Sequence, residues 1–419
     1  MDIRSQTREE LQTRFEAWAQ PLYRVPQLLQ WLYVHRVTDW DAMTNLPRAL
    51  RDILAQHYTL RALELVRKQG ARDTTQKFLW RLADHSLIES VLIPASPALY
   101  GEPSDRHTLC VSTQVGCAYG CKFCASGLDG WKRNLTADEI VEQVLAVERW
   151  NAAQGTAQSP RSKVQGHQVE VSSLKSQASG PEGQVQSPEP TEESLHASCI
   201  THHASRSRIP HRAPSARLVS NLVIMGMGEP LANYDNLLKA LKILNASWGG
   251  GIGARKITIS TSGLAPQIRK LADEPLQFRL AISLHGATDE TRGKIMPVNR
   301  KFPLKELVAA CEYYQEKKGQ MLTFEYILIA GVNDSLDQAK PLAALARRLH
   351  AKVNLIPYNE VEGLSWQRPD EAVQEAFLAA LEKQKVPATL RREKGRDIDA
   401  ACGQLRLKTE REMAETHRP

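Results

Sequence analysis

The sequence Cys117-Ala-Tyr-Gly-Cys121-Lys-Phe-Cys124 decides how the rest of the chain is interpreted. Three cysteines at C-x3-C-x2-C spacing provide three thiolates from one loop, whereas an iron–sulfur cluster normally takes four. A cluster held by three thiolates keeps one metal open to a substrate or cofactor, which is typical of a catalytic site. The spacing alone leaves two alternatives open, a zinc site without its fourth ligand and a set of redox thiols.

Composition limits the class of protein. The chain has 419 residues, of which 42% are hydrophobic and 24% charged, as in soluble globular proteins of two or three domains. A net charge of +7 favours polyanionic partners. The N-terminus lacks a signal core and no run of about eighteen apolar residues occurs, so we expect a cytoplasmic protein without membrane contact. Seven unevenly spread cysteines do not form a secreted disulfide framework.

Changes in hydrophobic period divide the chain into regions. Residues 1–60 show helical spacing broken by prolines and predict a helical accessory module. Residues 61–102 alternate as in strands and predict a small β extension. We expect a larger core over residues 103–396 and a C-terminal segment over residues 397–419. Within the core, residues 151–217 contain no aromatic residue and are rich in polar ones, which predicts a disordered insertion.

The core alternates between strand and helix patterns. We expect six strands, at His107–Thr113, Leu218–Met225, Lys256–Ser260, Phe278–Leu284, Leu322–Leu328 and Lys352–Pro357. The expected helices are Thr136–Trp150, Asn236–Leu244, Pro303–Glu316, Asp337–Leu349 and Asp370–Lys385. Such repeated units imply an α/β protein with a parallel sheet, here an open, partial (β/α)6 barrel of the TIM type. The cysteine loop follows the first strand, and reactive groups gather at that end of the strands in such barrels.

Polar residues also follow the later strands. The glycines of Met225-Gly-Met-Gly-Glu-Pro230 allow a ligand to approach the backbone, and the Glu229 carboxylate is suited to accept a hydrogen bond from an ammonium group. Ser260, Ser283 with His285, and Asn359 end the next strands. Turn capping explains any one of them equally well, but their equivalent positions favour a shared ligand site.

Two cysteines outside the loop, and one carboxylate, need separate interpretation. Cys402 lies among glycines and charged residues, as expected of a reactive thiol, and the basic residues Arg391, Arg392, Lys394 and Arg396 are placed to lower its pKa. Cys110 lies within the first strand, whereas Cys311 fits a buried helix face. Pattern alone favours a solvent-facing side chain for Glu89 in its strand.

These motifs together resemble the RlmN/Cfr family of RNA methyltransferases, a branch of the radical S-adenosylmethionine (SAM) superfamily. The resemblance covers nearly all of the chain except the insertion. It includes Thr108–Cys117, Met225–Pro230 and Ser283-Leu-His285. Its most specific part is Asp397-Ile-Asp-Ala-Ala-Cys402-Gly-Gln-Leu405, which other radical SAM branches lack. The step after the fourth strand reads Ser-Leu-His-Gly rather than the commoner Ser-Leu-His-Ala.

The resemblance implies a role for each site residue. Cys117, Cys121 and Cys124 would hold one 4Fe-4S cluster, and SAM would be lined by Gly228, Glu229, Ser260, Ser283, Leu284, His285 and Asn359. One SAM would methylate Cys402. A second SAM, cleaved reductively, would give a 5′-deoxyadenosyl radical that activates the S-methyl group for addition to adenine. Glu89 would remove the proton from the adduct, and Cys110 would attack Cys402, releasing the product and forming a transient disulfide.

The implied substrates are an adenosine in the peptidyl-transferase region of 23S rRNA and the adenosine 3′ of the anticodon in tRNA, both methylated at carbon 2. The N-terminal module and basic residues such as Lys132, Arg133 and Arg391 would contact RNA. A flavodoxin-like electron donor and a monomeric state are also implied. The alternatives are Cfr-type methylation at carbon 8 and, more remotely, a non-enzymatic iron–sulfur RNA-binding protein.

Overall fold

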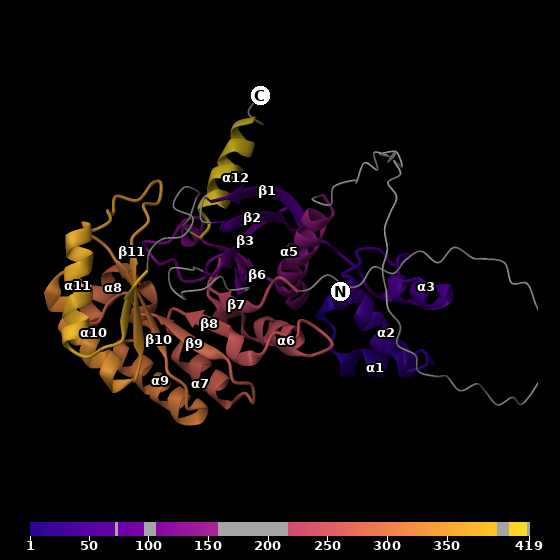
Figure 1. Cartoon of the computed structure of the whole chain (residues 1–419), viewed down its shortest axis with the longest axis horizontal. Coiled ribbons are helices and arrows are strands. Elements are labelled where there is room, and N and C mark those ends of the chain that lie inside the picture. Colours follow the sequence, from indigo (N-terminus) through magenta and orange to yellow (C-terminus); the bar gives the residue numbers. More distant parts are fainter. Residues whose placement is uncertain (72–73, 96–105, 158–216, 392–401, 417–419) are drawn as a thin grey trace, which may run out of the picture.

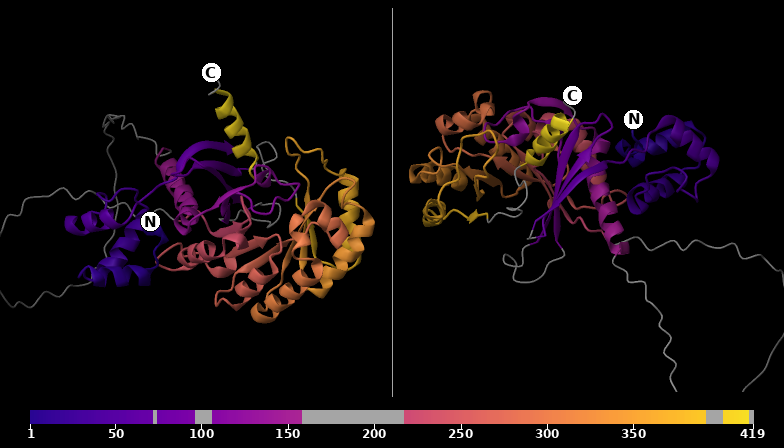
Figure 2. Two further views of the ribbon diagram at one scale, coloured as in Figure 1. Left: turned by 180° about the vertical axis from the view of Figure 1, so that it is seen from behind. Right: turned by 90° about the horizontal axis from the view of Figure 1, so that it is seen from above.

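The chain folds around one curved ten-stranded sheet. The computed structural model describes residues 1–71, 74–95, 106–157, 217–391 and 402–416. The strand order is β1-β2-β3-β4-β7-β8-β9-β10-β11-β12, and helices flank the barrel part of the sheet on its outer side (Figures 1 and 2). A separate hairpin pairs β5 (Gln114–Gly116) with β6 (Trp131–Asn134). The predicted α/β fold, with a mostly parallel sheet, is confirmed.

The barrel strands are parallel throughout. Each of the six predicted strands is present: β4 (His107–Cys110), β7 (Asn221–Ile224), β8 (Ile257–Thr261), β9 (Arg279–Ser283), β10 (Thr323–Leu328) and β11 (Lys352–Pro357). A further parallel strand, β12 (Ala388–Leu390), pairs with β11. The sequence did not predict β12, because three residues are too few to show a period.

Helices between the strands complete the barrel. The predicted ones are α5 (Ala137–Ala157), α6 (Tyr234–Asn245), α9 (Leu304–Lys318), α10 (Leu336–Arg348) and α11 (Glu371–Lys383). The structure adds α7 (Ala265–Asp273), α8 (Asp289–Ile295) and, at the C-terminus, α12 (Gln404–Thr416). Short 3-10 turns are η3 (Ala125–Gly127), η4 (Pro230–Asn233), η5 (Ala254–Lys256) and η6 (Pro297–Arg300). None of the helices in the described ranges is both long and apolar enough to cross a membrane.

The β extension continues the barrel sheet. Its strands β1 (Glu64–Gly70), β2 (Gln76–Arg81) and β3 (Leu87–Pro94) are antiparallel, and β3 pairs antiparallel with β4. One face of this extension joins the main core through Phe78, Trp80 and Ile88, while Leu79 and Leu87 on the other face pack against Leu405 of α12. The C-terminal helix is thereby docked on β2 and β3.

The N-terminal module is a group of short helices: η1 (Ile3–Ser5), α1 (Arg8–Ala17), α2 (Arg24–Gln30), the π-helical η2 (Trp31–His35) and α3 (Arg48–His57). A capping box between Thr7 and Glu10 starts α1, since each residue bonds the other's backbone N–H. Leu11 and Phe15 of α1 are fully buried and anchor the module in the core.

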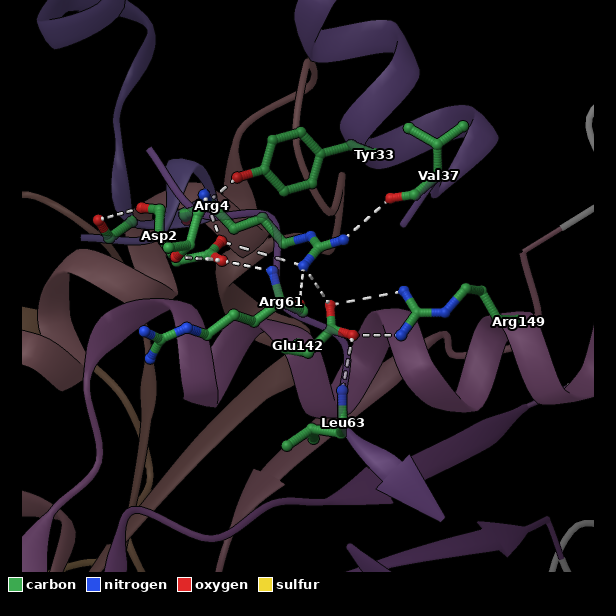
Figure 3. Close-up of polar contacts among 10 residues, drawn as sticks. Asp2, Arg4, Tyr33, Val37, Arg61, Leu63, Glu142 and Arg149 are labelled. Carbon is green, nitrogen blue, oxygen red and sulfur yellow. Dashed lines mark hydrogen bonds and ion pairs between the residues drawn. The ribbon is translucent and has the colours of Figure 1, made fainter. Parts of the chain in front are cut away.

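A buried polar network joins this module to α5 (Figure 3). Arg4 is fully buried; it donates to the Val37 carbonyl at 2.9 Å and lies 3.3 Å from the Glu142 carboxylate. Glu142 also pairs with Arg149 and accepts from the backbone N–H of Leu63 at 3.3 Å. The network holds the module in one orientation on the barrel.

A cleft of about 910 Å³ opens beside the Arg4–Glu142 network. None of the residues predicted for the cluster or SAM lines this cleft.

The boundary predicted for the insertion is partly wrong. Residues 151–157, which we assigned to it, continue α5 as helix. The greater part of the insertion, including Cys199, His202, His203 and His211, lies outside the described residues.

Candidate active site

The sheet register brings residues far apart in sequence onto one face. Val91 of β3 pairs with Cys110, so Glu89, two residues earlier, shares its face. Continuing through Val223 and Thr258, the same face includes Ser260 and then Ser283. The opposite face is formed by apolar residues such as Ile259 and is buried in the core. The C-terminal segment meets the sheet on this polar face, where Gly403 and Arg406 contact Glu89.

The cysteine loop leaves the end of β5 and is fixed at both ends. Gly116 has φ +76°, and a side chain there would overlap the Gly130 carbonyl, which accepts a hydrogen bond from the Cys117 N–H at 3.1 Å. Further on, the Lys122 N–H donates to the carbonyl of Ile295 in α8 at 3.0 Å. The loop thus lies between the β5–β6 hairpin and α8.

The three loop thiols suit a cluster better than a single ion. Burial raises the pKa of Cys117 and Cys121, and raises that of Cys124 to about 12; the charges of neighbouring cysteines add to the effect at Cys121 and Cys124. Three such thiols ionise together only when a cationic group compensates them. Within the part of the chain described, no three His, Cys, Asp or Glu side chains are close enough to share one metal ion. A cluster meets this requirement for a compensating charge, because each of its thiolates binds a different iron.

Glu229 organises the glycine turn after β7. Its carboxylate is buried and accepts from the backbone N–H groups of Leu231 at 3.0 Å and Ser262 at 2.7 Å. Burial raises the pKa of this carboxyl group. Gly228 beside it has φ +102°, and a side chain there would lie 2.6 Å from Cβ of Gln114. The turn is therefore pinned both to the end of β8 and to β5.

The remaining residues predicted for SAM follow β8, β9 and β11. The hydroxyl groups of Ser260 and Ser283 are 3.2 Å apart. His285 is buried, and its Nδ1 accepts from the Ile327 N–H at 3.1 Å; burial lowers its pKa to about 3, so the imidazole is neutral. Leu284 is buried and Asn359 half-buried. The structure therefore brings Ser260 and Ser283 into contact. Leu284 and His285 follow β9, and Asn359 follows β11.

Arg292 is a buried residue that sequence analysis missed. This α8 side chain is fully buried and donates to the carbonyls of Ser283 and Leu284 after β9, and to that of Ser262 after β8. It therefore ties two neighbouring strand ends together at the predicted SAM site. Little in the sequence indicated this role, because α8 is too short to show helical periodicity and so does not identify Arg292 as a buried residue.

The thiols of Cys110 and Cys402 lie in contact, and both are free rather than joined in a disulfide. Cys402 Sγ lies 3.4 Å from the Met225 carbonyl, and its own carbonyl accepts from Ser126 Oγ at 3.0 Å. A hydrogen bond from the Cys110 thiol lowers the pKa of Cys402, while that bond and burial raise the pKa of Cys110. Cys402 is therefore the thiol favoured to ionise.

Of the predicted basic patch, the structure describes Arg391. Lys77, which sequence analysis did not single out, and then Arg391 lower the pKa of Cys402 by smaller amounts than Cys110 does. Arg392, Lys394 and Arg396 lie outside the described residues. Cys311 is fully buried, in agreement with its predicted core role.

Glu89 does not face water, and that interpretation of its pattern was wrong. The side chain is 3% exposed and forms an ion pair at 3.0 Å with Lys77, itself 1% exposed. Its two oxygens accept from the backbone N–H groups of Gly403 and Arg406, each at 2.7 Å. A lysine inside an apolar strand, on the same face as Glu89, was the available signal for this pair.

The basic residues predicted to contact RNA differ in their surroundings. Arg133 is paired with Asp84 and with Glu139, each at 2.7 Å, so it is engaged within the protein. Lys132 is half exposed and 3.8 Å from Glu410. Arg391 is exposed. Only Lys132 and Arg391 therefore present their charge to solvent.

Comparison with protein families assigns two parts of the chain. Residues 1–60 match the ribosomal RNA large subunit methyltransferase N-terminal domain, and residues 212–339 match the radical SAM superfamily. The first match coincides with the helical module, and the second spans β7 to β10.

Individual proteins match nearly the whole length. A probable dual-specificity RNA methyltransferase RlmN 3 of Opitutus terrae is 49% identical over 98% of this chain and 95% of its own. A probable dual-specificity RNA methyltransferase RlmN of Akkermansia muciniphila is 46% identical over 98% and 97% of the two chains. The crystal structure of a radical SAM methyltransferase from Sphaerobacter thermophilus superposes with a TM-score of 0.76 at 38% identity, covering 96% and 98%.

Proposed function

Because the chain belongs to the RlmN family of radical SAM RNA methyltransferases, we propose that it methylates carbon 2 of adenosine through a methyl group held on Cys402. The substrates are the peptidyl-transferase region of 23S rRNA and the adenosine 3′ of the anticodon in tRNA. The observation that carries the proposal is the meeting of two free thiols, Cys110 and Cys402, on the sheet face that also presents Glu89 and the strand-end serines.

The cofactor sites follow from the donor groups. Cys117, Cys121 and Cys124 hold one 4Fe-4S cluster, and the strand ends at Gly228–Glu229, Ser260, Ser283–His285 and Asn359 line SAM. Two SAM molecules are used in each turnover. When bound, the cluster and the second SAM supply the radical chemistry that activates the methyl group, which is needed because carbon 2 of adenine is not nucleophilic. Arg292 and Glu229 fix the backbone of these strand ends.

Cys402 is the methyl acceptor. Its thiolate attacks the methyl carbon of the first SAM; a sulfur–carbon bond forms and S-adenosylhomocysteine leaves. The hydrogen bond from Cys110 favours this thiolate and keeps the proton on Cys110 during the step.

Glu89 and Cys110 complete the reaction. Once the carbon on Cys402 is bonded to adenine, Glu89 takes the proton from carbon 2 of the ring, and the unpaired electron that radical addition leaves on the adduct would return to the one-electron redox centre that the cluster supplies. The thiolate of Cys110 then attacks the sulfur of Cys402, the sulfur–carbon bond breaks, and its electron pair goes to the product carbon, which takes up a proton. The two thiols are oxidised to a disulfide that an external reductant must open before the next turnover.

The partners are RNA and a one-electron donor of the flavodoxin type. The N-terminal module, held against α5 by Arg4 and Glu142, and the exposed charges of Lys132 and Arg391 contact RNA chiefly through its shape and backbone. We propose a monomer acting in the cytoplasm, where its substrates are.

The test is mass spectrometry of nucleosides from rRNA and tRNA fragments incubated with the reconstituted protein, SAM and a reductant. The proposal predicts 2-methyladenosine. A peak of 8-methyladenosine would assign the Cfr-type regiochemistry instead. Cleavage of SAM without methylated adenosine would refute the proposed substrate.

A further inference from the structure

The C-terminal helix α12 begins with a residue that has no side chain to cap it. Gly403 is the N-cap, because its carbonyl accepts the first helical hydrogen bond, from Leu407 N–H at 3.1 Å. Helices usually begin with a Ser, Thr, Asp or Asn side chain that bonds a free backbone N–H group. Here a larger side chain is excluded, since φ is +87° and a Cβ would lie 2.8 Å from Ser126 Oγ. The cap must come from elsewhere.

Glu89 of β3 supplies that cap. Its two oxygens accept from the N-cap N–H of Gly403 and from the N–H of Arg406, three residues on. In an ordinary capping box two side chains of the helix itself satisfy these same two groups. A negative carboxylate at this position is also favoured by the helix dipole, and Lys77 balances its charge in the buried site.

The cap acts directly on the methyl-bearing residue. Cys402 adjoins Gly403, so the hydrogen bond that fixes the Gly403 amide also fixes the Cys402 carbonyl carbon across one peptide plane. We propose that Glu89 is the positioning residue that docks Cys402 for methylation, and that it must release α12 before it serves as the base. This rests on the proposed function and adds a step to it.

The two roles of Glu89 are successive for a geometric reason. In the docked arrangement both oxygens accept short hydrogen bonds and one pairs with Lys77, so neither is directed at a substrate carbon. Release of α12 frees the carboxylate while Cys402 is joined to RNA. Docking thus belongs to methyl loading, undocking to removal of the ring proton, and renewed docking, which returns Cys402 to Cys110, to the disulfide step that releases the product.

The test separates the positioning role of Glu89 from its role as base. Each variant is measured in two half-reactions, methylation of Cys402 and formation of the protein–RNA adduct. Glu89→Gln combined with Lys77→Met removes both buried charges and leaves one oxygen acceptor. Glu89→Ala removes both acceptors. The control is Glu412→Gln, which breaks the 2.6 Å ion pair between α12 and Arg67 away from Gly403. In each reconstituted protein we measure iron content, amide exchange of residues 404–416, and S-methylation of Cys402 by SAM without RNA, followed by formation of the protein–RNA adduct.

We expect both Glu89 variants to lose amide protection at Arg406 and to methylate Cys402 about 10–100-fold more slowly, since charge-assisted hydrogen bonds are lost. Glu412→Gln is expected to methylate Cys402 at the wild-type rate. Wild-type methylation in both Glu89 variants, with adduct accumulating, would overturn the positioning role and leave the proposed function intact. Wild-type methylation together with wild-type turnover would refute both the docking role and the role of Glu89 as base.

Discussion

Gly403→Ala is a test of the contact between the C-terminal segment and the cysteine loop. At this position the backbone has φ +87°, and the new Cβ would lie 2.9 Å from the backbone nitrogen of Ser126. Ser126 follows the last loop cysteine within η3, so the methyl group pushes two parts of the site apart.

The expected effect can be worked from these two features. A non-glycine residue in such a conformation costs about 1–3 kcal/mol. Forcing a methyl group into an occupied position costs a further amount of about 1–3 kcal/mol. A combined effect of about 3 kcal/mol raises the population of undocked α12 roughly 100-fold, since 1.4 kcal/mol corresponds to a factor of ten.

The assay is amide exchange of residues 404–416 together with the rate at which SAM methylates Cys402. Gly319→Ala is the matched control: it also has positive φ, at +60°, but a Cβ there meets nothing within 4 Å, and it lies at the end of α9. We expect about 1 kcal/mol of global destabilisation and no change at Cys402 in the control. If Gly403→Ala behaves like the control in both measurements, the close contact does not hold Cys402 in place.

Three further predictions follow from the same structure. Cys110→Ala removes the donor that lowers the pKa of Cys402, so the pH midpoint of Cys402 alkylation moves upward, whereas Cys110→Ser keeps a donor and moves the midpoint less. Peptide mass spectrometry measures the alkylation of Cys402 in both variants. An unshifted midpoint in Cys110→Ala would contradict the assigned cause. Glu142→Gln removes the nearer of the two carboxylates that pair with the buried Arg4 and leaves that of Asp2 at 3.9 Å. This loss lowers the free energy of unfolding by roughly 3 kcal/mol and speeds proteolysis of residues 1–60. Unchanged thermal unfolding would show that the junction contributes little. Cys121→Ala removes one cluster ligand, so iron content and visible absorption fall to background, and full iron content would refute the three-thiolate site.

The barrel could be predicted because its strands and helices alternate with clear periods. The exceptions were short or charged elements. The edge strand β1, for example, exposes Glu64 and Leu65 and so shows no regular alternation of apolar residues. β12 and α8 are too short to show a period at all.

The site was harder to predict where partners come from distant segments. The cysteine loop and the strand-end motifs are local in sequence and could be identified by spacing. The burial of Glu89 depends on Lys77 across the sheet and on Gly403, which is 314 positions away along the chain. Among the described residues, Cys110 lowers the pKa of Cys402 more than Arg391 does. The sequence pattern of a single segment cannot predict contacts such as those of Glu89 with Gly403 or of Cys402 with Cys110, because the partners lie in distant segments.

The central claim is that the methyl carbon of the product passes through Cys402. The direct measurement is to load Cys402 with an isotopically labelled methyl group, remove the labelled SAM, and start a single turnover on an RNA fragment with unlabelled SAM and a reductant. The account predicts that the label appears in the methyladenosine of this first turnover. Unlabelled product, with the label still on Cys402, would contradict it.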